Sequence, residues 1–173
     1  MPRLVVVLPL VPLLVGESFA MQDWPLHITV LPPFLTHASS EHIADAIAAA
    51  TSGQPAISAI AGRDELFGRR QNVPVTVVED NEALTLLHRT LAAAVLPFAA
   101  TPNEPAFTGP GFRPHITVKP HGRVHEGDEL SLSQLALVDM APRAAPQGRL
   151  VLATLPLLRD LRLRGAGGQR SDA

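Results

Sequence analysis

Two copies of one six-residue motif hold the side chains best suited to chemistry in this sequence. Residues 27–32 read His-Ile-Thr-Val-Leu-Pro, and residues 115–120 read His-Ile-Thr-Val-Lys-Pro. A single copy is typical of an ordinary strand, because Ile, Thr and Val all favour extended structure. Strand propensity does not require a histidine at the same place in both copies. We therefore interpret the pair as functional, the alternative being an internal duplication that kept two buried histidines.

The spacing within each motif divides its side chains between two faces. Successive side chains of a strand point to opposite faces, so His27 and Thr29 share one face while Ile28 and Val30 share the other. The second copy repeats this division, with His115 and Thr117 on one face. We predict that the two strands lie side by side across a cleft. Their apolar faces would be buried under helices, and their His and Thr side chains would converge on one ligand.

Two histidines that face one ligand are suited to general acid and base catalysis near neutral pH. Attack of water on a phosphodiester needs both roles, because one imidazole takes a proton from the water and the other protonates the departing ribose oxygen. The hydroxyls of Thr29 and Thr117 would donate hydrogen bonds to the phosphoryl oxygens as negative charge builds there. This chemistry requires neither a metal nor another cofactor.

Two cations next to the second motif are candidate substrate contacts. Lys119, the only lysine of the chain, lies two residues beyond Thr117 and would share its face. Arg113 precedes His115 by two residues and would share the face of that histidine if the strand is regular. Both could bind phosphate, although a lysine at a strand end is often simply solvated.

The sequence around both motifs resembles the two-histidine (2H) phosphoesterase superfamily. Residues 24–30, Trp-Pro-Leu-His-Ile-Thr-Val, and residues 112–118, Phe-Arg-Pro-His-Ile-Thr-Val, carry the resemblance. It is strongest to the branch of 2′-5′ RNA ligases and cyclic phosphodiesterases. The apolar start, Pro-Pro-Phe at 32–34, the Phe67-Gly68 turn and the Leu87-His88 pair also fall where features of that family would.

The resemblance implies an α+β fold of two related lobes, with antiparallel sheets along a central cleft, helices packed outside and a pseudo-twofold axis. It also implies metal-independent hydrolysis of a 2′,3′-cyclic phosphate or a 2′-5′ linkage of a nucleotide or RNA end. By analogy His27 would be the acid and His115 the base, with Thr29 and Thr117 holding the phosphoryl group. Two other functions stay open, namely 2′-5′ RNA ligation and non-catalytic binding of a nucleotide or RNA end.

A surface for stacking a nucleobase has few candidates, because the chain contains no tyrosine. The aromatic residues available near the motifs are Trp24, Phe34, Phe107 and Phe112. We predict that Phe34 and Phe112 contact the substrate, although each of the four could equally belong to the core.

Composition limits the partners. The formal net charge is −2, the isoelectric point is near 6.4 and 17% of residues are charged, so no basic field exists for a long nucleic-acid backbone. We expect a small nucleotide or an RNA end as substrate, no long duplex, no membrane and a monomer. The absence of cysteine is compatible with a reducing compartment, and we predict a cytoplasmic protein.

The start of the chain has some features of a signal peptide, since Arg3 precedes an apolar run. Pro9 and Pro12 interrupt that run, and Glu17 lies where a cleavage region would be uncharged. We therefore interpret residues 3–8 as the first core strand.

The remaining pattern predicts two helices and about seven strands. The helices run from Ser39 or Ser40 to about Gly53 and from Asn81 to about Val95. Strands are expected at 3–8, 24–31, 56–61, 73–79, 115–118, 130–138 and 149–157, with Pro32-Pro33 stopping the second and a hairpin loop at 142–148 joining the last two. Residues 102–111 are predicted to form a loop. Residues 1–164 would form one bilobal domain, and residues 165–173 a flexible tail.

Other polar clusters are weaker candidates for a site. His121, His125 and Glu126 could suggest a metal site, but the glycine between the histidines favours an exposed turn. Arg69 and Arg70 could guide a phosphate, although a solvated pair in a loop is the simpler interpretation.

Overall fold

The computed structural model describes residues 1–108, 111–145 and 147–159. Within them, nine strands form one sheet in the order β2-β9-β8-β1-β3-β6-β5-β4-β7, and neighbouring strands pair antiparallel. The strands are β1 (Arg3–Pro9), β2 (Ser18–Ala20), β3 (His27–Leu35), β4 (Ile57–Phe67), β5 (Val73–Val78), β6 (His115–Thr117), β7 (Glu129–Leu132), β8 (Gln134–Asp139) and β9 (Gly148–Pro156). The predicted tail at 165–173 lies outside the described residues.

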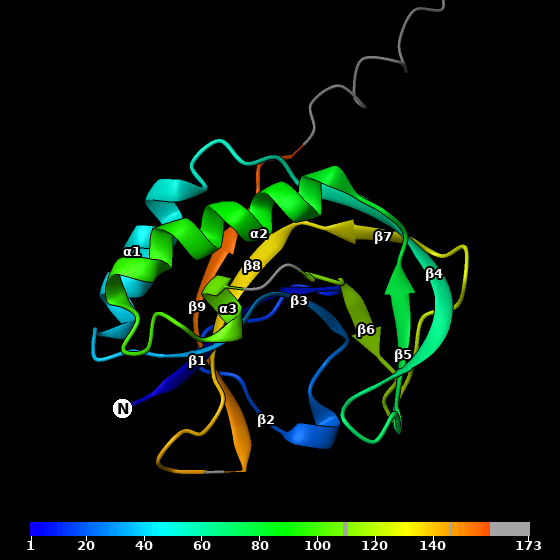
Figure 1. Cartoon of the computed structure of the whole chain (residues 1–173), viewed down its shortest axis with the longest axis horizontal. Helices are drawn as coiled ribbons and strands as arrows, with labels where there is room; N and C mark the ends of the chain where they lie inside the picture. Colours follow the sequence, from blue (N-terminus) through cyan, green and yellow to red (C-terminus); the bar gives the residue numbers. More distant parts are fainter. Residues whose placement is uncertain (109–110, 146, 160–173) are drawn as a thin grey trace, which may run out of the picture.

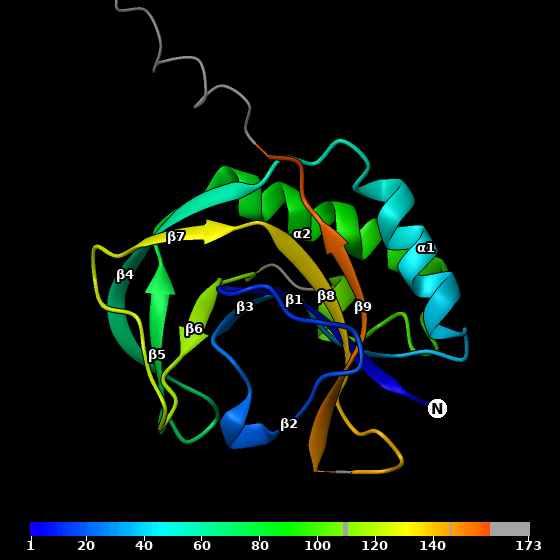
Figure 2. The ribbon, with the colours of Figure 1, turned by 180° about the vertical axis from the view of Figure 1, so that it is seen from behind.

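Two longer helices, α1 (Ser40–Ala50) and α2 (Glu82–Val95), lie beside each other on one side of the sheet (Figure 1, Figure 2). Each is capped as its sequence predicts: the side chain of Ser39 accepts a hydrogen bond from the His42 amide, and that of Asn81 accepts one from the Leu84 amide. The short helices are η1 (Met21–Asp23), η2 (Leu96–Phe98) and α3 (Pro105–Thr108). None of the helices in the described part of the chain is long and apolar enough to cross a membrane.

The core has two parts, one on each face of the sheet. The larger lies between the sheet and the helices, and it takes Leu4, Val6 and Leu8 from β1. The smaller lies on the opposite face, and it takes Val5 and Val7 from the same strand together with Trp24. β1 is therefore buried on both faces, which is why its sequence is continuously apolar.

The prolines after the first motif do not end its strand, contrary to expectation. β3 continues through Pro32 and Pro33 to Leu35. The register on β1 changes between the pairs Val6↔Leu31 and Leu4↔Phe34, so both prolines lie in a bulge opposite a single residue. A bulge tolerates proline because its residues need not donate to the ladder.

The strand expected at 56–61 also continues further than predicted, because β4 runs through Gly62 to Phe67. A Cβ atom at this position would lie 2.8 Å from the Val77 carbonyl oxygen, so the glycine permits a close approach of β5. The register of β4 on β5 shifts at the same place, between Ala61 and Asp64.

Two other expectations need correction. Residues 130–138 form two strands, β7 and β8, that separate at Ser133: β7 pairs with β4, whereas β8 pairs with β1 and β9. The predicted hairpin is formed by β8 and β9. The expected loop at 102–111 contains the short helix α3.

A matched pair of leucines in α2 tests the helix–sheet core. Leu87 is 1% exposed and its neighbour Leu86 is 52% exposed. We expect Leu87→Ala to lower the free energy of unfolding by about 2–5 kcal/mol, because it leaves a cavity in the core. Leu86→Ala should change it by no more than about 0.5 kcal/mol. Urea unfolding followed by circular dichroism measures both, and equal effects would contradict this packing.

Candidate functional site

The two motif strands are neighbours in the sheet. β3 and β6 pair antiparallel with Ile28 opposite Ile116, and both isoleucines are buried against the helices. This register places His27 opposite Thr117 and Thr29 opposite His115 on the other face of the sheet. The four polar side chains thus form one cluster, the motif cluster. The strands lie side by side as expected, but as directly paired strands of one sheet and not on two walls of a cleft.

Both imidazoles are held in the same way by their own chain. Nδ1 of His27 donates to the carbonyl of Pro25 at 2.7 Å, and Nδ1 of His115 donates to the carbonyl of Arg113 at 2.8 Å. A carbonyl can only accept, so the proton of each neutral ring resides on Nδ1. Nε2 of each ring is left as a base, or as a donor once protonated.

Burial lowers the pKa of both histidines, and it does so unequally. The pKa of His27 falls to about 4, chiefly through desolvation, with smaller contributions from the charges of Lys119, His115 and Arg149. Desolvation also lowers the pKa of His115, with a smaller contribution from Arg113. In both cases the hydrogen bond to the backbone carbonyl opposes the shift by stabilising the imidazolium form. The ligand-free protein therefore holds both rings neutral at pH 7.

Each histidine also contacts an aromatic ring. Trp24 stacks on His27 with ring centroids 4.0 Å apart, and Phe67 contacts His115 edge-on at 4.6 Å. Trp24 is buried, so it supports the imidazole and has little surface left for a nucleobase. Phe67 was not among the predicted site residues. It lies at the end of β4, and only the strand pairing brings it next to the second motif.

The two predicted cations lie at the motif cluster. The side chain of Lys119 donates to the Met21 carbonyl at 3.1 Å, and its charge acts on His27. Arg113 lies over the Phe67 ring, 4.9 Å from the centroid, and forms a 2.5 Å ion pair with Glu65. The charge of Arg113 is thus partly neutralised.

A cavity of about 520 Å³ opens beside His115 and Thr29. Arg113 and Phe112 line it, and the rest of the lining is Pro32, Pro33, Leu66, Phe67, Gly68, Gln71 and Gly111. Phe34 does not reach it. Its side chain is fully buried and contacts Phe107 edge-on. Phe34 is therefore a core residue, which corrects the prediction that it contacts the substrate.

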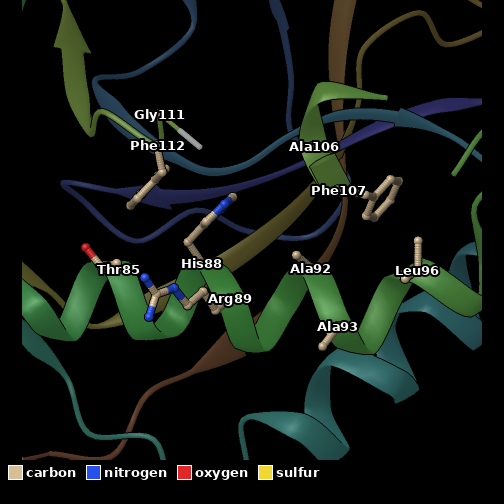
Figure 3. Close-up of a pocket in the computed structure, with 10 residues that line it drawn as sticks. All are labelled: Thr85, His88, Arg89, Ala92, Ala93, Leu96, Ala106, Phe107, Gly111 and Phe112. Carbon is tan, nitrogen blue, oxygen red and sulfur yellow. The ribbon is translucent and has the colours of Figure 1, made fainter. Parts of the chain in front are cut away.

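A second cavity of about 450 Å³ lies between α2 and α3 and is also lined by Gly111 and Phe112 (Figure 3). Here the ring of His88 stacks flat on Phe112 at 4.3 Å, and its Nδ1 donates to the Val30 carbonyl at 2.8 Å. His88 therefore ties the segment before the second motif to the strand of the first. The family resemblance marked the Leu87-His88 pair as a shared feature, but the sequence assigned His88 no role, because it lies in the middle of a helix.

The weaker candidates lie in exposed turns. Arg69 and Arg70 are exposed. Nε2 of His121 donates to the Trp24 carbonyl at 3.2 Å, and the amide of His125 donates to Asp128. Within the described ranges, no group of three or more His, Cys, Asp and Glu side chains is arranged to hold a metal ion.

Comparison with known proteins identifies the family. The model of the 2′-5′ RNA ligase superfamily matches residues 17–155, which include both motifs. The chain belongs to the 2′-5′ RNA ligase superfamily. No curated protein matches the sequence significantly.

Solved structures share the fold. A Thermus thermophilus protein, TT0787, aligns with a TM-score of 0.58 and 21% identity over 90% of this chain and 97% of its own. Escherichia coli LigT complexed with NADP+ aligns with a TM-score of 0.57 and 16% identity, and LigT complexed with 3′-AMP with 0.55 and 17%; both cover 90% of this chain and 98% of LigT. The protein therefore has the LigT-like 2H phosphoesterase fold.

The lowered pKa of His27 predicts a loss of stability in acid. The unfolded chain takes up a proton near pH 6.5 and the folded chain only near pH 4, so the free energy of unfolding should fall as the pH decreases between these values. At pH 5 the loss due to His27 should be about 2 kcal/mol. Urea unfolding of the wild type and of His27→Gln at pH 7 and pH 5 measures it. The variant should lose less stability than the wild type, and an equal loss would contradict the shift.

Proposed function

We propose that this protein is a metal-independent phosphodiesterase that hydrolyses a 2′,3′-cyclic phosphate or a 2′-5′ linkage of a nucleotide or RNA end. The observation that carries the proposal is the β3–β6 register. It gathers two imidazoles, each held through Nδ1, and two threonine hydroxyls on one sheet face. Membership of the 2′-5′ RNA ligase superfamily supports a phosphoester substrate.

In the proposed reaction a phosphoryl group lies above the motif cluster. One Nε2 takes a proton from the attacking water, and the other Nε2 donates its proton to the ribose oxygen as the P–O bond breaks. Thr29 and Thr117 donate hydrogen bonds to the phosphoryl oxygens, where charge develops. Lys119 adds a positive charge beside His27.

The unequal pKa values suggest how the two histidines divide these roles. With its pKa near 4, His27 stays neutral in weak acid and can accept a proton. His115 has fewer cations acting on it, and we assign it the role of the acid. This reverses the assignment that the family resemblance implies.

The substrate is proposed to be small. LigT has been crystallised in complex with NADP+, 3′-AMP and ATP. The volume of the cavity in this protein, about 520 Å³, lies in the usual range for sites that bind small molecules. The nucleoside would lie in this cavity, beside Phe67 and Phe112. We further propose that the protein acts as a monomer in the cytoplasm.

Activity on the four 2′,3′-cyclic nucleotides, with a chelator present, tests the proposal. We expect turnover to be unchanged by the chelator and to fall about 100-fold or more in His27→Gln and in His115→Gln. Thr29→Val and Thr117→Val should each lose about 100-fold in kcat, because each removes a hydrogen-bond donor to the phosphoryl group. His42→Gln is the matched control, since His42 is exposed on α1, and it should keep full activity.

Four outcomes would contradict or change this conclusion. Loss of all activity with the chelator, or normal turnover in His115→Gln, would contradict the two-histidine mechanism. Binding of nucleotides by the wild type and both His variants, with no turnover, would favour a binding module. Joined 2′-5′ products from a cleaved RNA pair would favour ligation.

The pH dependence of kcat/KM tests the division of roles. The active form needs a neutral His27 and a protonated His115, so the profile should be bell-shaped, with its maximum above pH 4 and below pH 6.5. Initial rates between about pH 3.5 and 8.5 measure it. A maximum above pH 7 would contradict this assignment.

A further inference from the structure

His27 lies in a stack that neither motif contains. The Trp24 ring lies 4.0 Å from His27 with 26° between the planes, and the guanidinium carbon of Arg149 lies 5.3 Å from the Trp24 centroid. We call these residues the Arg149–Trp24–His27 stack. It joins the end of η1, the start of β3 and β9, three segments of which the last is far from the others in the sequence.

The segment that carries Trp24 is fixed from both halves of the sheet. The indole packs in the smaller core with Val5 and Val7 of β1. From beyond β6, Nζ of Lys119 donates to the Met21 carbonyl and Nε2 of His121 donates to the Trp24 carbonyl. The indole is thereby a fixed surface against which the imidazole lies.

Arg149 carries a charge that no acid of the described residues neutralises. Its Nη1 donates to the backbone carbonyls of Met140 and Gly148, and no carboxylate in that part of the chain forms an ion pair with it. Its Nε and the Trp24 Nε1 are buried without an acceptor in the structure. A buried donor without an acceptor lowers the stability of the folded protein. Such unfavourable groups are found most often at functional sites.

The surroundings of His115 differ from those of His27 in both the aromatic contact and the nearby cation. Its aromatic neighbour Phe67 meets it edge-on, and the cation over that ring, Arg113, is paired with Glu65. The charged or titratable groups that act on His27 are Lys119 and His115 from the β6 side and Arg149 from β9, and no carboxylate of the described chain is among them. Each histidine therefore contacts an aromatic ring that in turn contacts an arginine, but the two arginines differ. Arg149, next to Trp24 and His27, has no carboxylate partner among the described residues, whereas Arg113, next to Phe67 and His115, is paired with Glu65.

We propose that Trp24 and Arg149 are positioning residues that fix the ring of His27 and keep it as the neutral, proton-accepting member of the pair. Stacking on Trp24 sets the plane of the imidazole, and the Pro25 carbonyl holds its Nδ1 proton. Nε2 is then directed at the phosphoryl group. Arg149 acts through Trp24 and opposes a positive charge on His27. The inference rests on the proposed two-histidine mechanism.

Titration of the histidine ring signals by NMR tests the stack without relying on turnover. Arg149→Met removes the charge and keeps most of the length of the side chain. It should raise the titration midpoint of His27 by a small part of the total shift, because burial is the main cause of that shift and remains. Trp24→Leu should do the same and lower kcat about tenfold, with KM changed less than about threefold, because ring orientation is lost and phosphate contacts remain. Trp24→Phe keeps an aromatic face and should restore most of the activity.

Leu13→Ala is the structural control. Leu13 is buried in the same small core and is not a member of the stack, so this variant should lose stability and keep the His27 titration. Arg149→Lys keeps the charge and should hold the midpoint closer to that of the wild type than Arg149→Met does.

An unchanged His27 midpoint and an unchanged acidic limb of kcat/KM in Arg149→Met would overturn the proposal. A midpoint that moves equally in Leu13→Ala would attribute the shift to general packing of the small core and would also overturn the proposal. If the wild type hydrolyses no cyclic nucleotide, the proposed function fails, while the NMR midpoints still decide whether Arg149 and Trp24 control His27.

Discussion

The pairing of β3 with β6 is the contact on which the rest of the structure depends. It joins the half of the sheet built on β1, β8 and β9 to the half built on β4, β5 and β7. Ile28 and Ile116 meet at this seam and are buried under the helices. A shift of one residue would turn every side chain of one strand to the other face. The hydrophobic burial of the two isoleucines therefore also sets which side chains form the motif cluster on the opposite face.

Antiparallel pairing gives the seam a local two-fold relation, and the surroundings break it. In each motif the histidine faces the threonine of the other strand, and each Nδ1 is bound to the carbonyl two residues earlier. What lies behind the rings differs. His27 is supported by a stacked indole with Arg149 over it, whereas His115 has an edge-on phenyl ring and a cation neutralised by Glu65. Such a difference in surroundings gives the two rings different affinities for a proton.

Several features could be predicted from the sequence because they depend only on residues that are close together in the chain. Alternation within the motifs separated Ile28 and Ile116 from the polar side chains, and Ser39 and Asn81 were recognisable at the starts of the helices. Local rules failed where a partner strand changed the outcome. Pro32 and Pro33 are strand breakers in isolation, yet β1 accommodates them in a bulge. Gly62 looks like a break, yet it is needed where the Val77 carbonyl of β5 comes close.

The sequence by itself determined that two His-Thr strands exist, which of their faces is polar, and that Lys119 and Arg113 accompany the second. Residue type and a period of two are enough for those conclusions. Only the tertiary structure decided that the strands are direct neighbours, that Phe34 belongs to the core, and that Phe67, His88 and Arg149 belong around the site. These last three residues are 48, 27 and 34 positions from His115 in the sequence. Their proximity follows from strand register and helix packing, which depend on the burial of the whole apolar surface and leave no mark on any one short stretch of residues.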